Sequence, residues 1–263
     1  MDIKSLGYRT DIMLRLLEGS ERSDHGDYVV IRSPANPAYW WGNFLLMAAP
    51  PAPGGAVSWQ SRFDAEFPAA EHLALGLDVT DASAVDSAEF QAAGLTFRRE
   101  VVLTASAVHP PPDLSQVAQL RPLAGSGDWQ QAVELRADCY RDDPATARGF
   151  LASRVATQRE LTEAGHGRWF GAFTGGTLVA QLGIISDGRG VARYQDVETH
   201  PAARRQGLAG ALVRQAGRYA LAELGARTLV IVADPAGPAV RIYRAAGFEA
   251  SEDQLSWERP PAP

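Results

Sequence analysis

A short segment in the second half of the chain has the residue types that bind an anion. A strand-like run ends at Thr199, a His200-Pro201 break follows, and a helical pattern begins after Gly207. The first amides of a helix have no internal partner and carry the positive end of the helix dipole. Gly207 has no Cβ, so an anion can approach the backbone closely, and Arg204 and Arg205 add positive charge. The segment therefore predicts a phosphate site, with a pyrophosphate as the first choice.

Two common phosphate-binding patterns do not match this turn. A Walker loop needs G-x-x-x-x-G-K-[ST], and neither a lysine nor a hydroxyl residue follows Gly207. A dinucleotide fingerprint needs G-x-G-x-x-G directly after a strand. The spacing here is R-x-x-G-x-A, formed by Arg204, Gly207 and Ala209.

This hexapeptide resembles the coenzyme A pyrophosphate loop of the GNAT N-acetyltransferase superfamily, whose pattern is Q/R-x-x-G-x-G/A. Downstream, the segment from Tyr243 to Phe248, Y-R-A-A-G-F, is similar to the Y-x-x-x-G-F segment of the same superfamily. Many members carry an asparagine seven residues before this tyrosine. Here Ala236 takes that position, and Asp234 is the candidate substitute.

The second half also has the element order of a GNAT domain. Hydrophobic periodicity and turn signals predict strands at residues 116–122, 168–173, 177–185, 191–199 and 228–233, and helices at 128–141, 144–165, 208–224 and 239–246. Asp128 is the expected N-cap of the first helix. Gly175-Gly176 predicts a hairpin, and Gly225 is expected to end the third helix. The resemblance covers residues 116–259 and implies an α/β (α+β) fold, a mixed central sheet flanked by helices.

The first half contains a weaker copy of the same pattern. The segment from Phe90 to Leu95, F-Q-A-A-G-L, parallels the segment that begins at Tyr243, and each follows an apolar strand ending in aspartate, Asp78 or Asp234. Strands are predicted at residues 71–80 and 95–104, and helices at 58–67 and 87–93. This indicates a second, smaller and degenerate GNAT-like α/β domain. Chance similarity of a β-α-β segment is the alternative.

A proline-rich linker separates the two halves. H-P-P-P-D at residues 109–113 is stiff. We therefore expect an N-terminal domain at residues 1–107, a linker at 108–115 and an acetyltransferase domain at 116–263.

Composition and charge limit the class of protein. The net charge of −6 argues against nucleic acid as the main partner, and the apolar run at residues 44–53 is too short and proline-rich to span a bilayer. The N-terminus lacks a signal-peptide pattern. We expect a cytoplasmic protein with no membrane partner; a homodimer is left open.

Cysteine and histidine usage argues against a metal site. Cys139 is the single cysteine and the five histidines lack ligand spacing. Cys139 shares a helical face with Trp129, Ala132, Val133 and Tyr140, so it is expected to be a small buried residue rather than a nucleophile.

The resemblance implies acetyl-CoA as co-substrate and a role for each matching residue. Backbone groups of Val197 and Thr199 would bind the pantetheine arm and the thioester carbonyl, and the amides of residues 205–210 would hold the pyrophosphate. Tyr243 would protonate the leaving thiolate, the alternative being a packed helix tyrosine. The predicted cofactor-binding residues are Val197, Thr199, Arg204, Arg205, Gln206, Gly207, Leu208, Ala209, Gly210, Asp234 and Tyr243.

The general base is less well defined by the sequence. Strict alternation along residues 191–199 puts Asp196 and Glu198 on one strand face, and Arg193 and Gln195 on the other with Val197 and Thr199. A substrate on the second face would be reached by neither carboxylate without a bulge. Glu198 is the candidate base, a surface charge is the alternative for it, and solvent is the alternative base.

The sequence therefore predicts an N-acetyltransferase that moves an acetyl group from acetyl-CoA to a primary amine of a small molecule or peptide. Two alternatives are a CoA-binding sensor or interaction module without turnover and a nucleotide-binding protein unrelated to CoA. Residues 36–44 cluster Tyr39, Trp40 and Trp41 with two asparagines. They would either wall an acceptor pocket or pack at an inter-domain seam.

Overall fold

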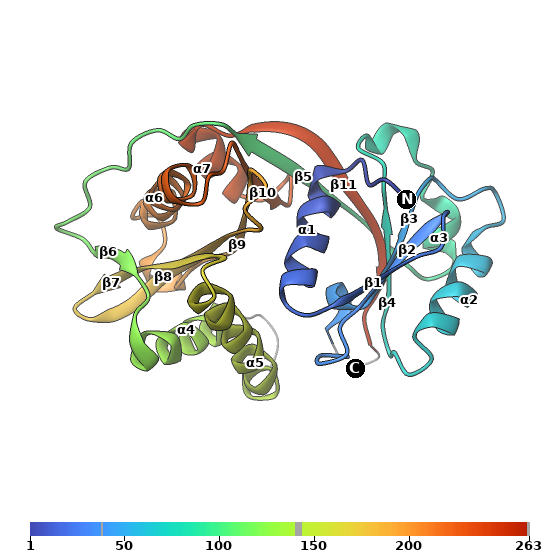
Figure 1. Cartoon of the computed structure of the whole chain (residues 1–263), viewed down its shortest axis with the longest axis horizontal. Coiled ribbons are helices and arrows are strands. Elements are labelled where there is room, and N and C mark those ends of the chain that lie inside the picture. Colours follow the sequence, from blue (N-terminus) through green and yellow to red (C-terminus); the bar gives the residue numbers. More distant parts are fainter. Residues whose placement is uncertain (38, 140–143, 262–263) are drawn as a thin grey trace. The chain divides into compact units, whose positions relative to one another are not determined.

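The computed structural model describes residues 1–37, 39–139 and 144–261, which pack into two compact units (Figure 1). Unit 1 consists of Met1–Val102, Val232–Gly237 and Ala250–Pro263, and unit 2 consists of Leu103–Ile231 and Pro238–Glu249. The sequence division assigns residues 250–263 to the second domain, whereas the structure groups them with unit 1. The reason is that β11 (Glu249–Arg259) pairs antiparallel with β4 (Leu73–Leu77), from Leu255 opposite Leu77 to Arg259 opposite Leu73.

Unit 2 is a sheet with helices on both faces. Its strands follow the order β10-β9-β8-β7-β6, in which β9 and β10 are parallel and the other pairs are antiparallel. In Figure 1, α4 and α5 lie on one side of β7, β8 and β9, and α6 lies on the other. The strands are β6 (Gln119–Pro122), β7 (Gly167–Thr174), β8 (Thr177–Ser186), β9 (Val191–Thr199) and β10 (Thr228–Ala233). The helices are α4 (Gly125–Cys139), α5 (Pro144–Glu163), α6 (Leu208–Glu223), α7 (Ala239–Ala246) and the short η3 (Pro201–Ala203).

Most predicted elements of this unit are confirmed, several of them to the residue. The predicted bounds of β9, β10 and α7 are those of the structure. Along α6 the apolar residues at four-residue intervals, Leu208, Leu212, Ala216 and Ala220, are buried, and the helix packs against β8 and β9.

One helix start was placed wrongly from the sequence. Helix α4 begins at Gly125, three positions before the predicted cap Asp128. The Asp128 carboxylate lies inside the first turn, where it accepts a hydrogen bond from the Ala124 amide at 2.7 Å and pairs with Arg121. A carboxylate near a helix N-terminus is stabilised by the free amides there. Asp128 therefore indicated the first turn of the helix correctly, but it is not the residue that precedes the helix. Tyr140 and Arg141, the last residues of the predicted helix, lie outside the described residues.

Unit 1 has strands and a hydrophobic core of its own. The strand order is β1-β2-β3-β4-β11-β5, with β3 and β4 parallel, and the buried side chains between sheet and helices include Tyr8, Phe44, Phe63, Phe90 and Trp257. The elements not yet bounded are α1 (Leu6–Leu17), β1 (Glu21–Asp24), β2 (Tyr28–Arg32), η1 (Trp40–Gly42), β3 (Phe44–Met47), α2 (Ala56–Glu66), η2 (Ala82–Ala84), α3 (Ala88–Ala92) and β5 (Thr96–Ala105).

The two similar hexapeptides have the same local structure. Each runs from a short helix through a left-handed glycine into a strand, with φ of 84° at Gly94 and 109° at Gly247. The Leu95 amide donates to the Phe90 carbonyl at 3.0 Å, and the Phe248 amide donates to the Tyr243 carbonyl at 3.1 Å. The step from helix through left-handed glycine to strand after α3 is therefore repeated after α7, in structure as well as in sequence.

The aromatic segment at residues 36–44 is packed inside unit 1. Trp40 stacks on His72 with ring centroids 6.2 Å apart, Trp41 packs on Phe44 at 5.6 Å, and the Arg15 guanidinium lies 4.8 Å from the Tyr39 ring. Ala38 lies outside the described residues. These contacts account for the aromatic side chains by packing, and a contribution to an acceptor pocket stays a prediction.

Candidate functional site

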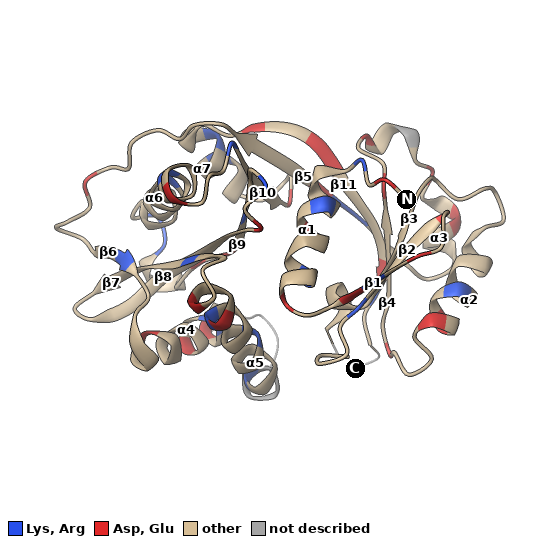
Figure 2. Cartoon of the chain, in the orientation of Figure 1, with Lys and Arg blue, Asp and Glu red and all other residues tan. Residues whose placement is uncertain are grey.

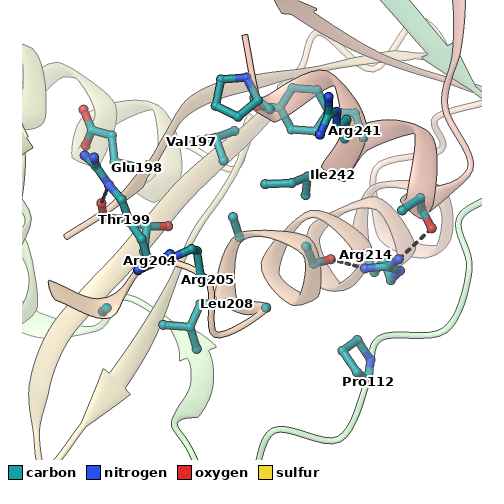
Figure 3. Close-up of a pocket in the computed structure, with 18 of the residues that line it drawn as sticks. Pro112, Val197, Glu198, Thr199, Arg204, Arg205, Leu208, Arg214, Arg241 and Ile242 are labelled. Atoms are coloured by element: carbon teal, nitrogen blue, oxygen red, sulfur yellow. Dashed lines mark hydrogen bonds between the residues drawn. The ribbon is translucent and has the colours of Figure 1, made fainter. Parts of the chain in front are cut away.

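A cavity of about 880 Å³ opens in unit 2 where β9 ends and α6 and α7 begin (Figure 3). All predicted cofactor-binding residues line it except Gln206 and Asp234, and the candidate base Glu198 lines it too. Gln206 is exposed on the loop. Asp234 lines a different cavity, which belongs to unit 1 and includes Arg98 and Glu258.

The turn before α6 presents a row of free amides to this cavity. Arg205 and Gly207 both have left-handed backbone, with φ of 63° and 82°. The first bond of the helix runs from the Ala211 amide to the Gly207 carbonyl at 3.0 Å. Among the residues that the structure describes, no acceptor is found for the amides of residues 205–210. Successive free amides at a helix start form an anion site.

Four arginines line the same cavity and make it basic. Arg204 donates from Nε to the Thr199 carbonyl at 3.2 Å, and Arg214 donates to the carbonyls of Gly210 and Ala245 at 2.9 and 2.6 Å (Figure 3). Arg205 and Arg241 complete the set. Figure 2 marks the basic residues of α6 and α7 in blue.

Sequence reasoning missed Arg214 and Arg241. Arg214 lies one helical turn after Gly210, and this i, i+4 spacing from the phosphate loop was the available signal.

Strand β9 runs beyond its parallel ladder with β10 before it reaches the cavity. The ladder pairs residues 228–230 with residues 191–193, and β9 continues to Thr199. Val197 and Thr199 both line the cavity, where the Val197 side chain faces Ile242 (Figure 3). This is the position at which the resemblance places the groups that bind the pantetheine arm.

A β-bulge in β9 overturns the predicted alternation of its side chains. Gln195 lies opposite Gly183 and Glu198 lies opposite Gln181, so two residues of β9 face Leu182 alone. Asp196 has left-handed backbone there, with φ of 48°. Since Gly183 and Gln181 share a face of β8, Glu198 shares a face with Gln195, and the placement of these two on opposite faces was wrong. The structure therefore contains the bulge that a carboxylate of β9 requires to reach a substrate on the second face of the strand.

The Glu198 carboxylate is mostly buried beside an arginine. Its side chain is 22% exposed, and its Oε2 atom accepts hydrogen bonds from Gln181 Nε2 at 2.7 Å and from Arg136 Nε at 3.3 Å. Burial raises the pKa of Glu198, the Arg136 charge opposes this rise, and the Asp196 charge adds to it. The alternative of a solvated surface charge is wrong. A carboxylate with a raised pKa at a cavity wall is suited to accept a proton.

Tyr243 of α7 lines the same cavity. Tyr243 is 5% exposed and packs its ring on Phe248. Within the described part of the chain, no hydrogen-bond partner is found for its hydroxyl. Burial raises the pKa of Tyr243 to about 12. The phenol therefore remains a proton donor throughout the neutral pH range.

Cys139 lies on the wall of this cavity rather than in the core. It is half-buried, and burial raises the pKa of its thiol. A raised pKa reduces the thiolate fraction, so the expectation that Cys139 is not a nucleophile agrees with its surroundings.

None of the described helices is long and apolar enough to cross a bilayer, and no group of three or more His, Cys, Asp or Glu side chains is arranged to hold a metal ion in that part of the chain.

The cavity combines the free amides before α6, the Glu198 carboxylate and the Tyr243 phenol. These groups suit the transfer of a group from a phosphorylated co-substrate. Residues 129–248 match the model of the acetyltransferase (GNAT) family. The chain therefore contains a GNAT acetyltransferase domain. A search of curated proteins finds no match.

Solved structures share the fold over nearly the whole chain. A GCN5-related N-acetyltransferase from Kribbella flavida is 21% identical, with a TM-score of 0.67 and coverage of 98% of this chain and 97% of that one. A tandem GNAT protein from the clavulanic acid biosynthesis pathway is 17% identical, with a TM-score of 0.60 and coverage of 100% and 94%. A conserved protein of unknown function from Staphylococcus epidermidis is 11% identical, with a TM-score of 0.72 and coverage of 92% and 95%. The two-unit fold fits a tandem GNAT arrangement.

Proposed function

We propose that this protein transfers an acetyl group from acetyl-CoA to a primary amine of a small molecule or peptide. The observation that carries the proposal is the row of free amides at residues 205–210, which lies in a cavity lined by four arginines. Such a site suits the pyrophosphate of CoA. Glu198 and Tyr243 line the same cavity. A candidate proton acceptor and a candidate proton donor therefore lie in the cavity that would bind the acyl group.

The proposed reaction is direct attack of the amine on the thioester carbonyl. A C–N bond forms, the C–S bond breaks, and the amine loses a proton while the thiolate gains one. Glu198 takes the amine proton, directly or through water, and Tyr243 gives its hydroxyl proton to sulfur. The backbone of Val197 and Thr199 orients the thioester.

The proposal is tested by thiol release from acetyl-CoA across a panel of primary amines, with CoA binding measured in parallel by calorimetry. Acceleration of thiol release by one class of amine supports acetyl transfer. Tight CoA binding without thiol release by any amine would contradict turnover and would favour a CoA-binding module. Competition by ADP or NAD as strong as that by CoA would contradict CoA specificity.

We expect one CoA to bind per chain, because the corresponding helix start in unit 1 is already occupied. The Glu89 carboxylate accepts hydrogen bonds from the amides of Gly54 and Ala56 at 2.8 and 2.6 Å, at the start of α2. The preceding residues 50–53 are three prolines and an alanine, and they include no arginine. Phe90 stands at the tyrosine position of this copy and has no proton to donate. Calorimetric titration measures the stoichiometry, and a value near two would contradict the assignment of unit 1 as degenerate.

The pH dependence of kcat/KM should show an acid limb set by Glu198 and no alkaline limb from Tyr243 below pH ~10. Protonated Glu198 cannot accept a proton, so activity falls as the pH drops through a pKa raised by burial. Tyr243, with a pKa of about 12, keeps its proton as the pH rises through the neutral range. The profile is compared with that of Glu198→Gln, which keeps the titration of the substrate amine. An acid limb that is the same in both proteins would contradict Glu198 as the base.

A further inference from the structure

A buried polar cluster stands behind Glu198, on the side of the sheet covered by α4 and α5. Arg136 of α4 is 5% exposed, Gln158 of α5 is 3% exposed, and Gln181 of β8 is fully buried. Together with Asp196 and Glu198 they form one connected network. A buried guanidinium is costly unless it is paired, and here two carboxylates of the bulged strand pair with it.

Arg136 is shared unequally between the two carboxylates. Its Nη2 atom lies 2.7 Å from Asp196 Oδ2, whereas its Nε atom lies 3.3 Å from both oxygens of Glu198. Gln158 also donates to Asp196 Oδ2, at 2.6 Å. The shorter contact of the Arg136 guanidinium is therefore with Asp196, and the longer one is with the candidate base Glu198.

We propose that Arg136 is a positioning residue for the general base Glu198, and that Asp196, turned toward Arg136 by the bulge, determines how strongly Arg136 stabilises the ionised base. The inference rests on the proposed function of Glu198. Arg136 favours the carboxylate form of Glu198 through its charge. Asp196 disfavours that form in two ways, because it is a like charge and because it holds the nearer end of the guanidinium. The opposing charges of Arg136 and Asp196 therefore keep Glu198 ionised enough to accept a proton and basic enough to hold it.

The charged and titratable groups that interact with Glu198 in the described structure belong to α4 and β9, while Tyr243 and the four arginines line the same cavity. Arg136 and the Cys139 thiol belong to α4, and Asp196 belongs to β9 itself; Gln181, from β8, is neutral. Arg204 faces the Cys139 thiol and adds positive charge beyond it. Arg136 and Asp196 form the shortest ion pair described at this site, at 2.7 Å, so they are the substitutions to test.

The test compares two variants that should move the same group in opposite directions. Asp196→Asn removes the like charge and releases Arg136 to Glu198, so the acid limb of kcat should move down by about one pH unit. Arg136→Gln removes the stabilising charge, so the limb should move up by about one pH unit. KM for acetyl-CoA should change little in either variant. Asp128→Asn removes another carboxylate paired with an arginine and should leave the limb in place.

A second readout does not depend on turnover. The side-chain carboxyl of Glu198 is followed by carbon-13 NMR during a pH titration and is assigned by its absence in Glu198→Gln. Its pKa should fall in Asp196→Asn and rise in Arg136→Gln. Asparagine tolerates left-handed backbone, so Asp196→Asn should keep the bulge. If Arg136→Gln does not fold, the direction of the Glu198 pKa shift in Asp196→Asn is a sufficient test by itself.

The possible failures are distinguishable. An unchanged Glu198 pKa in folded Asp196→Asn, or shifts of the same sign in both variants, would overturn the proposed role of Arg136. Opposite shifts together with normal turnover by Glu198→Gln would instead overturn Glu198 as the base and leave the charge coupling in place.

Discussion

Gly207→Glu is expected to abolish CoA binding by a protein that remains folded. The new carboxylate stands at the free amides of residues 205–210, where the pyrophosphate would sit. Like charges about 4–5 Å apart repel by ~3–4 kcal/mol at an effective dielectric constant of ~20, which corresponds to a CoA affinity at least ~100-fold weaker. The four cavity arginines would hold the carboxylate in place, much as Glu89 occupies the start of α2 in unit 1. Calorimetry with CoA measures the loss, and far-UV circular dichroism checks the fold.

Gly225→Glu is the matched control for this variant. Gly225 follows the other end of α6 and has a φ of 63°. A Cβ at this position would have no neighbouring atom within 4 Å, so the same substitution is strained but not crowded. Its effect on stability should resemble that of Gly207→Glu, because both place a side chain in left-handed backbone. CoA binding should persist in the control. Undiminished CoA affinity in folded Gly207→Glu would contradict the assignment of the phosphate loop.

The geometry of the turn before α6 was predictable because it is determined by consecutive residues. The strand end, the His200-Pro201 break, the left-handed Gly207 and the helix that follows all lie within one short segment. Local signals also placed β10, α7 and the β7–β8 hairpin, since buried apolar runs and glycine turns need no knowledge of distant residues.

Features that depend on distant contacts were not predictable in the same way. Strand β1 reads E-R-S-D and is exposed along its whole length, so no apolar pattern marks it. The membership of β11 in unit 1 follows from pairing with β4, which lies far away in the sequence. The bulge at Asp196 depends on left-handed backbone in a non-glycine residue, which strand alternation hides. Arg136 in turn reads as an ordinary helix arginine until the fold places it against β9.

Tyr243→Phe is expected to lower kcat about 100-fold, the low end for general acid catalysis, because a thiolate is already a fair leaving group. The substitution removes a hydroxyl for which no partner is found in the described structure, and it keeps the ring packing on Phe248. The free energy of unfolding should therefore change by about 1 kcal/mol or less. The CoA dissociation constant should stay within a few-fold of its original value, since the phosphate loop is unchanged. Steady-state kinetics and thermal unfolding give the two measurements.

Tyr194→Phe provides the opposite pattern as a control. Tyr194 is buried, does not line the cavity and donates its hydroxyl proton to the Val213 carbonyl of α6 at 2.7 Å. Loss of this buried hydrogen bond should cost about 1–2 kcal/mol of stability while kcat is nearly unchanged. The two tyrosines thus separate catalysis from packing within one unit. If Tyr243→Phe instead behaves like Tyr194→Phe, with normal kcat and reduced stability, Tyr243 is a packing residue and the proton that reaches sulfur must come from another donor.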